Sequence, residues 1–362
     1  MIRIAQLTKY GPLAASTRQR FHQYQPYLAA AGCDVELWPL LNDEYLSGIY
    51  SGNGRDPRHI LSGYADRAKR IFSSENVDLL WVHCEVFPYL PSIFESLIQL
   101  PKKPIVFDYD DAVFHNYDLH RNSIVRMLLG GKLKSVLSAA EIAFCGNKYL
   151  ENYARKYCRA TEIVPTVLNT ETFSPGRSSS NRAHAQIGWI GTPSTWAEYM
   201  APMMPILASV SKAQGARIAA VGAGKAAPPH PLLDNLPWSE ETEVTRIQDM
   251  DIGIMPLTDA PWARGKCGYK LIQYMACGLP VIASPVGVNA EIVEHGVNGF
   301  LATTEAEWRE ALVTLLGNQE LRRRMGAEGR RKVETQYSLQ AWGPRVAGML
   351  KEVVERGRLC SI

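Results

Sequence analysis

Three basic residues surround the expected start of a helix in the C-terminal half of the sequence. Arg264, Lys266 and Lys270 stand among glycines, which let a backbone approach a ligand closely. A helix N-terminus also presents unpaired N–H groups and a partial positive charge, so this segment suits a phosphate group. Lys266, Lys270 and Gln273 recur at i, i+4 and i+7, which predicts that they share one helix face. A solvated basic face beside a turn is the alternative interpretation.

A cluster of carboxylates closes an expected buried strand in the N-terminal half. Asp108, Asp110 and Asp111 lie at the end of the apolar run that begins at Pro104. Carboxylates so close together should repel one another, and one of them is expected to have a raised pKa. The Asp-x-Asp spacing could also bind a metal ion, and Asp110 or Asp111 could cap a following helix.

The elements that must position these residues alternate between strand and helix along the chain. Short apolar runs alternate with longer amphipathic stretches, which indicates an α/β fold with parallel sheets covered on both faces. Ligands bind such sheets in the loops that follow the carboxyl ends of the strands. The expected strands are 2–7, 34–39, 78–83, 104–109, 141–145, 162–165, 186–190, 217–221, 251–256, 279–284 and 299–301, and a helix is expected over 195–214.

A polar run rich in helix breakers divides the sequence into two Rossmann-like, doubly wound halves. We expect an N-terminal domain over 1–173, a linker over 174–185, a C-terminal domain over 186–336 and a helical tail over 337–362. Two such domains joined by a linker are expected to face one another across a cleft at the carboxyl ends of their sheets.

The composition is that of a globular protein and excludes several classes. The net charge of +3 is too small for a nucleic-acid-binding protein. The seven cysteines form no C-x-x-C pair, which favours free thiols over disulfides or a zinc site. The sequence shows neither a signal peptide nor an apolar run of about 18 residues. We therefore expect a cytoplasmic protein.

Peripheral contact with the inner face of the cell membrane is a further expectation. The segment 121–137 mixes apolar residues with Arg126, Lys132 and Lys134, a combination that suits an anionic membrane surface. Two glycines interrupt this segment, so an ordinary surface helix is the alternative.

The C-terminal block resembles the donor-binding region of the family 4 glycosyltransferases, which are retaining enzymes of the GT-B fold. The resemblance runs along nearly the whole chain and implies two facing Rossmann-like domains. The matching segments are 251–301 (DIGIMP, then KCGYKLIQYMACGLPVIASPVG and GVNGFL), the hinge-like 164–175 (VPTVLNTETFSP), Ile190-Gly191, Val221–Gly224, and the tail after Tyr337, which is similar to the family's helix that crosses back to the N-terminal domain.

Two departures from the family pattern affect the donor site. The family usually carries glutamates that contact the donor sugar and the ribose, at positions held here by Gly265 and Gln273. Gln273 can still hydrogen-bond a ribose diol through its amide, whereas a glycine cannot replace a carboxylate. The family also places basic residues after the first C-domain strand, where this chain has Thr192. We therefore expect the cations of Arg264, Lys266 and Lys270 to hold the donor diphosphate.

The resemblance implies roles for further residues after strands. Asp110 takes the position of a family histidine that faces the sugar, so Asp110 and Asp111 could bind sugar hydroxyls or stabilise positive charge at the anomeric carbon. Arg18 could equally face solvent, Trp238 could simply pack, and Glu291 could merely offset a helix dipole. Besides the basic residues and Gln273, the expected donor-binding residues are Gly11, Arg18, Gly191, Thr192, Trp238 (at the nucleobase) and Glu291 (at a donor hydroxyl), and the expected catalytic residues are Asp110, Asp111 and Lys266.

The implied function is transfer of a hexosyl group from a nucleoside-diphosphate sugar to a hydroxyl of a glycan or lipid-linked acceptor, with retention of configuration, in polysaccharide or glycolipid biosynthesis. A UDP-sugar is favoured over a GDP-sugar, with no tightly bound cofactor and no metal requirement. The missing family glutamate leaves an alternative open: a catalytically weak nucleotide- or glycan-binding subunit of a polysaccharide-assembly complex. An NAD-dependent oxidoreductase is disfavoured because no Gly-x-Gly-x-x-Gly follows the first strand.

Overall fold

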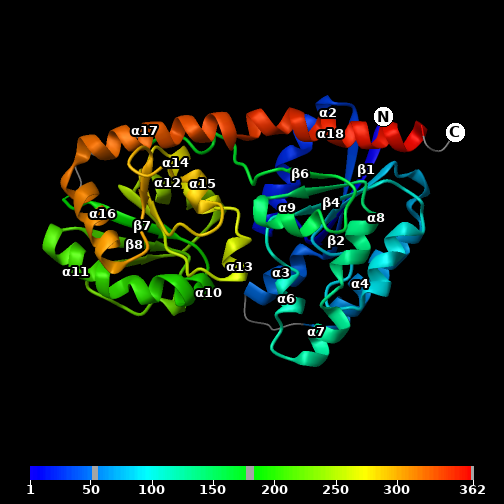
Figure 1. Ribbon diagram of the computed structural model, residues 1–362, viewed down its shortest axis with the longest axis horizontal. Coiled ribbons are helices and arrows are strands. Elements are labelled where there is room, and N and C mark those ends of the chain that lie inside the picture. Colours follow the sequence, from blue (N-terminus) through cyan, green and yellow to red (C-terminus); the bar gives the residue numbers. More distant parts are fainter. Residues whose placement is uncertain (51–55, 177–182, 360–362) are drawn as a thin grey trace. The chain divides into compact units, whose positions relative to one another are not determined.

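The computed structural model describes residues 1–50, 56–176 and 183–359 (Figure 1). Part of the expected linker, residues 177–182, therefore lies outside the described residues. The chain divides into two compact units. The first comprises Met1–Thr166 together with helix α18 (Leu339–Leu359) from Trp342 onward, and the second comprises Val167–Ala341.

The first unit is built on a six-stranded parallel sheet in the order β2-β1-β3-β4-β5-β6. Its central strands β3 and β4 are buried along their whole length, as expected for a sheet covered by helices on both faces. The strands are β1 (Ile2–Tyr10), β2 (Cys33–Leu41), β3 (Leu79–His83), β4 (Ile105–Tyr109), β5 (Ile142–Cys145) and β6 (Thr161–Ile163). The helices before α18 are α1 (Ala15–Arg20), α2 (Gln25–Ala30), α3 (Asp43–Tyr50), α4 (Pro57–Phe72), α5 (Ser92–Glu95), α6 (His115–Asp118), α7 (Ser123–Leu129), α8 (Leu133–Ala139) and α9 (Lys148–Ala154).

The second unit repeats this plan with a sheet in the order β12-β11-β10-β7-β8-β9. The strands are β7 (Gln186–Ile190), β8 (Arg217–Val221), β9 (Leu233–Leu236), β10 (Ile252–Met255), β11 (Val281–Ala283) and β12 (Gly299–Leu301). The helices are α10 (Pro193–Thr195), α11 (Met204–Gln214), α12 (Glu240–Gln248), α13 (Pro261–Arg264), α14 (Tyr269–Ala276), α15 (Asn289–Ile292), α16 (Glu305–Gly317) and α17 (Gln319–Gln336). The expected α/β class with parallel sheets is confirmed in both units.

The single helix expected over 195–214 is wrong. The structure has the short α10, then a π-helical turn and a 3-10 turn, and the regular helix α11 begins only at Met204. Pro202 and Pro205 explain the break, because proline lacks the N–H that a helix interior needs and clashes with the preceding turn. Here each proline occupies the start of its own helical segment.

Helix α18 belongs to the first unit through contacts near both of its ends. Gly343 lies against the ring of Tyr27, and the guanidinium of Arg358 donates to Asp78 Oδ1 at 3.0 Å. Although α18 is long, neither it nor any other helix in the described ranges combines the length and the apolar run that crossing a bilayer requires.

Candidate functional site

The ammonium group of Lys270 lies beside the carboxyl end of β7 in the second unit. Helix α14 starts at Tyr269, just after Gly268 in the left-handed region (φ +67°). Lys270 Nζ lies 4.7 Å from the centroid of the Trp189 ring, beside the carboxyl end of β7. A Cβ on Gly191 would come within 2.7 Å of that nitrogen and 2.5 Å of the Trp189 ring. Gly191 therefore leaves the room in which the ammonium sits.

The surroundings of Lys270 disfavour its charge when no anion is present. Burial, and secondarily the charge of Lys266, lower the pKa of Lys270 from 10.5 to about 7. An anion placed beside the ammonium would reverse this effect by stabilising the charged form. The charge of Lys266 thus acts on Lys270 across the turn that precedes α14.

The other basic residues of this segment are arranged differently from the prediction. Lys266 precedes α14 and is not part of it, because the left-handed Gly268 separates the turn from the helix. The helical spacing expected for Lys266, Lys270 and Gln273 therefore holds only for the last two. Arg264, at the end of α13, is exposed and bound by Asp259 through two hydrogen bonds of 2.6 and 2.8 Å.

Gln273 is buried and holds a carboxylate that the sequence analysis missed. Its amide nitrogen donates to Glu243 Oε1 at 2.9 Å, and the indole N–H of Trp238 donates to the same oxygen at 3.2 Å. Glu243 lies in the first turn of α12, where three glutamates simply suit the helix dipole. The sequence does not distinguish Glu243 from Glu240 and Glu241. Only its contact with Gln273, thirty residues away in the sequence, does so.

The loops after β7, β8 and β9 pack closely at the carboxyl edge of the second sheet. A Cβ on Gly222 would lie 2.3 Å from the carbonyl oxygen of Gly191 and 3.2 Å from Cβ of Trp238. The Trp238 side chain remains 39% exposed there. The structure thus brings together four predicted residues, Gly191, Trp238, Lys270 and Gln273, in one region of one unit.

Two predicted donor-binding residues have structural roles in their own loops. Thr192 caps α10 in a capping box with Thr195, so its hydroxyl is engaged in local hydrogen bonds. Glu291 is exposed on the short helix α15, and its carbonyl accepts a hydrogen bond from Lys332 at 2.6 Å.

In the first unit, Asp108 and Asp110 occupy different environments. Asp108 is fully buried and accepts two hydrogen bonds from Arg20, at 2.8 and 3.1 Å. Although burial lowers it, the pKa of Arg20 is raised above its ordinary value, chiefly by the Asp108 carboxylate. Since Arg20 neutralises Asp108, the Asp-x-Asp pair does not offer two carboxylates to one metal ion.

Asp110 lies at the carboxyl end of β4, next to an imidazole. His83 Nε2 is 3.3 Å from Asp110 Oδ1. Burial raises the pKa of Asp110, but the hydrogen bond and charge of His83 outweigh this and lower it below the usual range. Asp110 is therefore an ionised carboxylate at neutral pH. Neither Asp110 nor Asp111 caps the next helix, because α6 begins at His115 with Phe114 at its N-cap.

A cysteine next to His83 adds a third possible ligand atom. Cys84 has a positive φ of 61° and is the centre of a tight turn closed by the hydrogen bond from Glu85 N to His83 O. One ligand atom each of His83, Cys84 and Asp110 lie within 4.8 Å of one another, a donor set that zinc accepts. Burial and the surrounding carboxylates raise the pKa of the Cys84 thiol well above its ordinary value, which opposes the thiolate a metal would need.

The residues predicted after β1 shape their own loop. A Cβ on Gly11 would come within 2.4 Å of the Asp43 carboxylate, and Asp43 Oδ1 accepts from Leu13 N at 3.0 Å. The guanidinium of Arg18 donates to the carbonyls of Pro12 and Leu13 at 3.1 and 2.8 Å. Gly11 and Arg18 therefore stabilise this turn.

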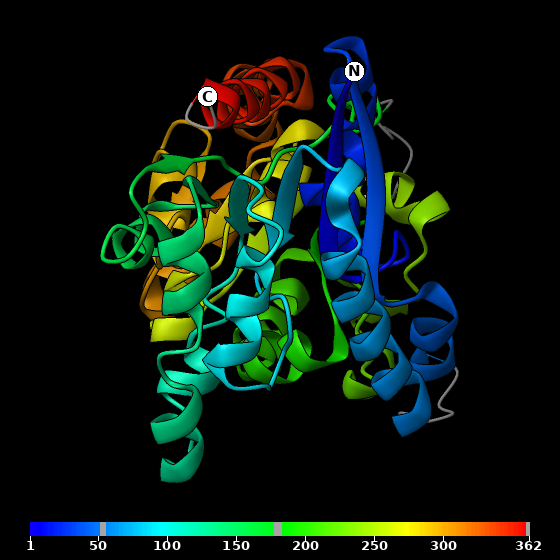
Figure 2. The same cartoon turned by 90° about the vertical axis from the view of Figure 1, so that its right-hand side faces the viewer.

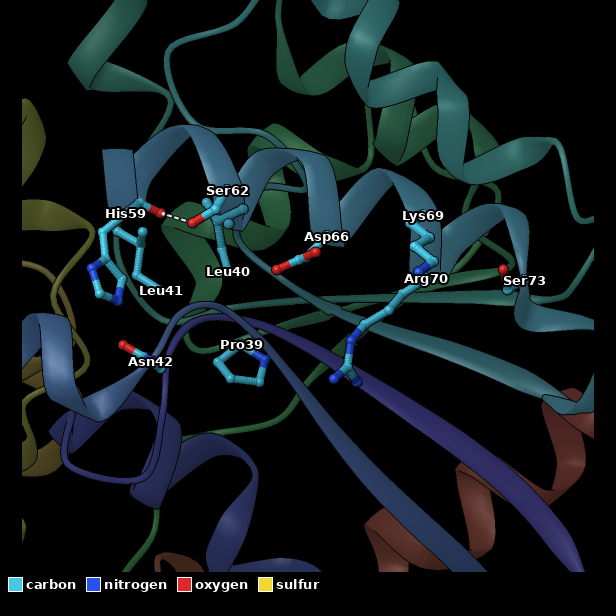
Figure 3. Close-up of a pocket in the computed structure, with 11 residues that line it drawn as sticks. Pro39, Leu40, Leu41, Asn42, His59, Ser62, Asp66, Lys69, Arg70 and Ser73 are labelled. Atoms are coloured by element: carbon cyan, nitrogen blue, oxygen red, sulfur yellow. Dashed lines mark hydrogen bonds between the residues drawn. The ribbon is translucent and has the colours of Figure 1, made fainter. Parts of the chain in front are cut away.

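A separate hollow of about 590 Å³ lies between β2 and α4 in the first unit (Figure 3). Its polar lining includes Asn42, His59, Asp66, Lys69 and Arg70. None of the predicted site residues lines this hollow, so the donor-site argument does not depend on it.

The second unit matches a known family. Residues 185–318 match the family described as "Glycosyl transferases group 1". The spore coat protein SA of Bacillus subtilis is 37% identical over 89 residues, and the N-acetyl-alpha-D-glucosaminyl L-malate synthase of Bacillus anthracis is 36% identical over 74 residues. The matched segments cover 24% and 19% of this chain, and only about a fifth of each relative's length, 22% and 19%.

Solved structures match along nearly the whole chain. Anabaena HepE in complex with UDP has a TM-score of 0.73 at 15% identity, covering 97% of this chain and 100% of its own. The sucrose-phosphate synthase of Thermosynechococcus elongatus has a TM-score of 0.70 at 15% identity, covering 98% and 100%. Residues 185–318 are thus similar to the group 1 glycosyl transferases, and the chain as a whole has the two-sheet GT-B fold that its sequence resembles.

Proposed function

We propose that the protein transfers a hexosyl group from a UDP-sugar to a hydroxyl of a glycan or lipid-linked acceptor, with retention of configuration. The observation that carries this proposal is the Lys270 ammonium, which lies over Trp189 beside Gly191 and has no carboxylate partner among the described residues. A diphosphate would supply the missing charge. HepE, which shares the fold, is described in complex with UDP and with UDP-glucose, and this supports UDP as the nucleotide.

In the proposed reaction, Lys266 and Lys270 stabilise the negative charge that the leaving diphosphate gains. The leaving group in turn helps to deprotonate the acceptor hydroxyl on the same face of the sugar, which retains the configuration. The ionised Asp110, together with Asp111, would bind sugar hydroxyls or stabilise the positive charge that develops at the anomeric carbon. Arg264 would have to leave Asp259 before it could contact a phosphate.

The proposal is tested by nucleotide release from a panel of UDP-hexoses. The wild-type protein is expected to release UDP from at least one of them, slowly even without acceptor, because water can replace the acceptor. Lys266→Ala should weaken UDP binding by more than about tenfold, the usual effect of losing a charged phosphate contact. Lys212→Ala is the matched control, since Lys212 is exposed on α11 in the same unit.

Two outcomes would speak against this proposal. Tight UDP binding with no release from any sugar nucleotide would favour the alternative of a catalytically weak, nucleotide-binding subunit. Absence of binding to both UDP and GDP at millimolar concentration would contradict the donor site itself.

We further propose that the acceptor is reached at a membrane surface through α7. Both views place α7 at the lower extremity of the first unit (Figures 1 and 2). Ile124, Met127 and Leu128 are exposed on it, at a spacing that gathers them on one face. Arg126 is exposed on the same helix, whereas Lys132, which was expected to contribute, is buried in an ion pair with Glu95. Apolar side chains beside a basic one suit the boundary between lipid headgroups and acyl chains.

A further inference from the structure

Glu243 presents a carboxylate that two neighbouring side chains hold by one oxygen. Gln273 Nε2 and Trp238 Nε1 both donate to Oε1, at 2.9 and 3.2 Å. No hydrogen bond to Oε2 is recorded from any residue in the described ranges 1–50, 56–176 and 183–359. Glu243 is only partly buried, so Oε2 remains an oriented acceptor that a ligand can reach.

Glu243 is connected to the Lys270 region through Gln273, which lies on the same helix as Lys270. Lys270 and Gln273 lie about one turn apart on α14, so a ligand whose phosphates contact Lys270 needs to extend by only about one helical turn to approach the residue that holds Glu243. Trp238 stands beside Gly222 with its ring partly exposed, which offers a face on which a base can stack. The group between phosphates and base is the ribose.

A carboxylate is well suited to the ribose because it accepts hydrogen bonds from hydroxyls and has no donor of its own. Nucleotide-binding folds use an acidic residue in this way for the ribose hydroxyl. Gln273 is buried and commits one N–H of its amide to Glu243, whereas Glu243 is partly exposed and offers a charged acceptor, which makes the stronger hydrogen bond to a hydroxyl. A glutamate at position 273 would instead place two carboxylates within hydrogen-bonding distance of each other, which is unfavourable unless one takes a proton.

We propose that Glu243 binds the ribose hydroxyls of a ribonucleoside diphosphate, with Gln273 and Trp238 as the positioning residues that orient its carboxylate. This inference rests on the proposed donor site and identifies the part of that site that selects ribo- over deoxyribonucleotides. The carboxylate of the site is supplied by α12, while α14 supplies the amide that holds it.

The test compares UDP with 2′-deoxy-UDP by isothermal titration calorimetry. The wild-type protein is expected to prefer UDP by about tenfold or more, the usual effect of a hydrogen bond to a charged group. Glu243→Gln should weaken UDP binding to a similar extent and bind both nucleotides equally. Glu240→Gln is the matched control, since Glu240 is an exposed glutamate in the same helical turn.

A charge exchange separates a specific role from a merely structural one. Gln273→Glu alone should weaken UDP binding, whereas the double variant Glu243→Gln with Gln273→Glu restores one carboxylate and one amide and should recover the preference for UDP. Melting temperatures of all variants establish that each is folded. If UDP binds but Glu243→Gln keeps the wild-type preference, the inference is overturned while the donor proposal stands. If the wild-type protein binds neither nucleotide, the donor proposal fails and this inference fails with it.

Discussion

The ammonium nitrogen of Lys270 lies 4.7 Å from the centre of the Trp189 ring. The ring face attracts the cation, yet burial and the nearby Lys266 charge disfavour it. Without an anion, the protonated form of Lys270 is therefore electrostatically disfavoured in this site. Such local destabilisation is common where a protein prepares a charge for a ligand, and it makes the proton on Lys270 a reporter of phosphate binding.

Nucleotide binding is expected to take up a proton between about pH 7 and pH 9. Free Lys270 has a pKa of about 7, and a bound diphosphate raises it by adding negative charge. The affinity for UDP should therefore fall as the pH rises above 7, by at most about tenfold per pH unit. Calorimetry in buffers of different ionisation enthalpy measures the proton uptake directly.

Lys270→Met provides the control for this linkage. The variant should bind UDP weakly and with no pH dependence in this range. Without UDP it should melt at a higher temperature than the wild type at pH 6.5. A lysine whose folded pKa is lowered destabilises the fold most below that pKa, and the stability returns as the pH rises from about 7 towards the ordinary value of 10.5. A wild-type affinity that is unchanged from pH 7 to pH 9 would contradict the phosphate role of Lys270.

Replacing Gly191 by alanine should displace Lys270 without unfolding the protein. The new Cβ would stand 2.7 Å from Lys270 Nζ and 2.5 Å from the Trp189 ring. The flexible end of the lysine can move, whereas the buried Trp189 ring can shift only at some cost, so we expect UDP affinity to fall by about tenfold or more and the melting temperature to fall as well. Gly317→Ala is the control, because nothing lies within 4 Å of its added Cβ. If Gly191→Ala binds UDP as tightly as the wild type, Gly191 is not part of the donor site.

The sequence alone predicted eleven of the twelve strands in the described residues, and it missed β9, whose run Leu-Asp-Asn-Leu is short and polar. Runs such as 79–82 are apolar throughout because the sheet is covered on both faces. Lys270, which lies beside Gly191, could be predicted as a candidate because glycines mark the start of its helix. Glu243 could not be predicted as a site residue. Its contact with Gln273 arises only from the packing of α12 near α14.

Two further errors have the same kind of cause. The sequence spacing of Lys266 predicted a helical position, but the left-handed Gly268 ends that periodicity before the helix begins. The Asp-x-Asp spacing suggested a shared metal ion, but Asp108 pairs with Arg20 and Asp110 with His83, although both carboxylates follow the same face of β4. Long-range pairing of charges is set by tertiary structure and leaves no periodic signal.

Removing one partner of the Arg20–Asp108 pair should destabilise the protein strongly. Both side chains are almost completely buried, with exposed fractions of 0% and 1%. Asp108→Asn leaves the guanidinium without a counter-charge, which typically lowers the free energy of unfolding by about 3–5 kcal/mol. Urea denaturation measures the change. Glu36→Gln breaks the exposed pair with Arg70 and should cost at most about 1 kcal/mol, so equal effects of the two variants would contradict this reasoning.

The exposed face of α7 should determine binding to anionic vesicles. Met127 and Leu128 are 76% and 58% exposed, and burying each in a membrane interface would contribute about 1.5–3 kcal/mol. Met127→Asp with Leu128→Asp should therefore abolish co-sedimentation with phosphatidylglycerol vesicles. Leu61→Asp is the matched control, because Leu61 is 72% exposed on α4 of the same unit. Equal loss of binding in both variants would mean that general charge, and not this face, governs the interaction. Binding that survives the α7 substitutions would exclude α7 as the membrane contact.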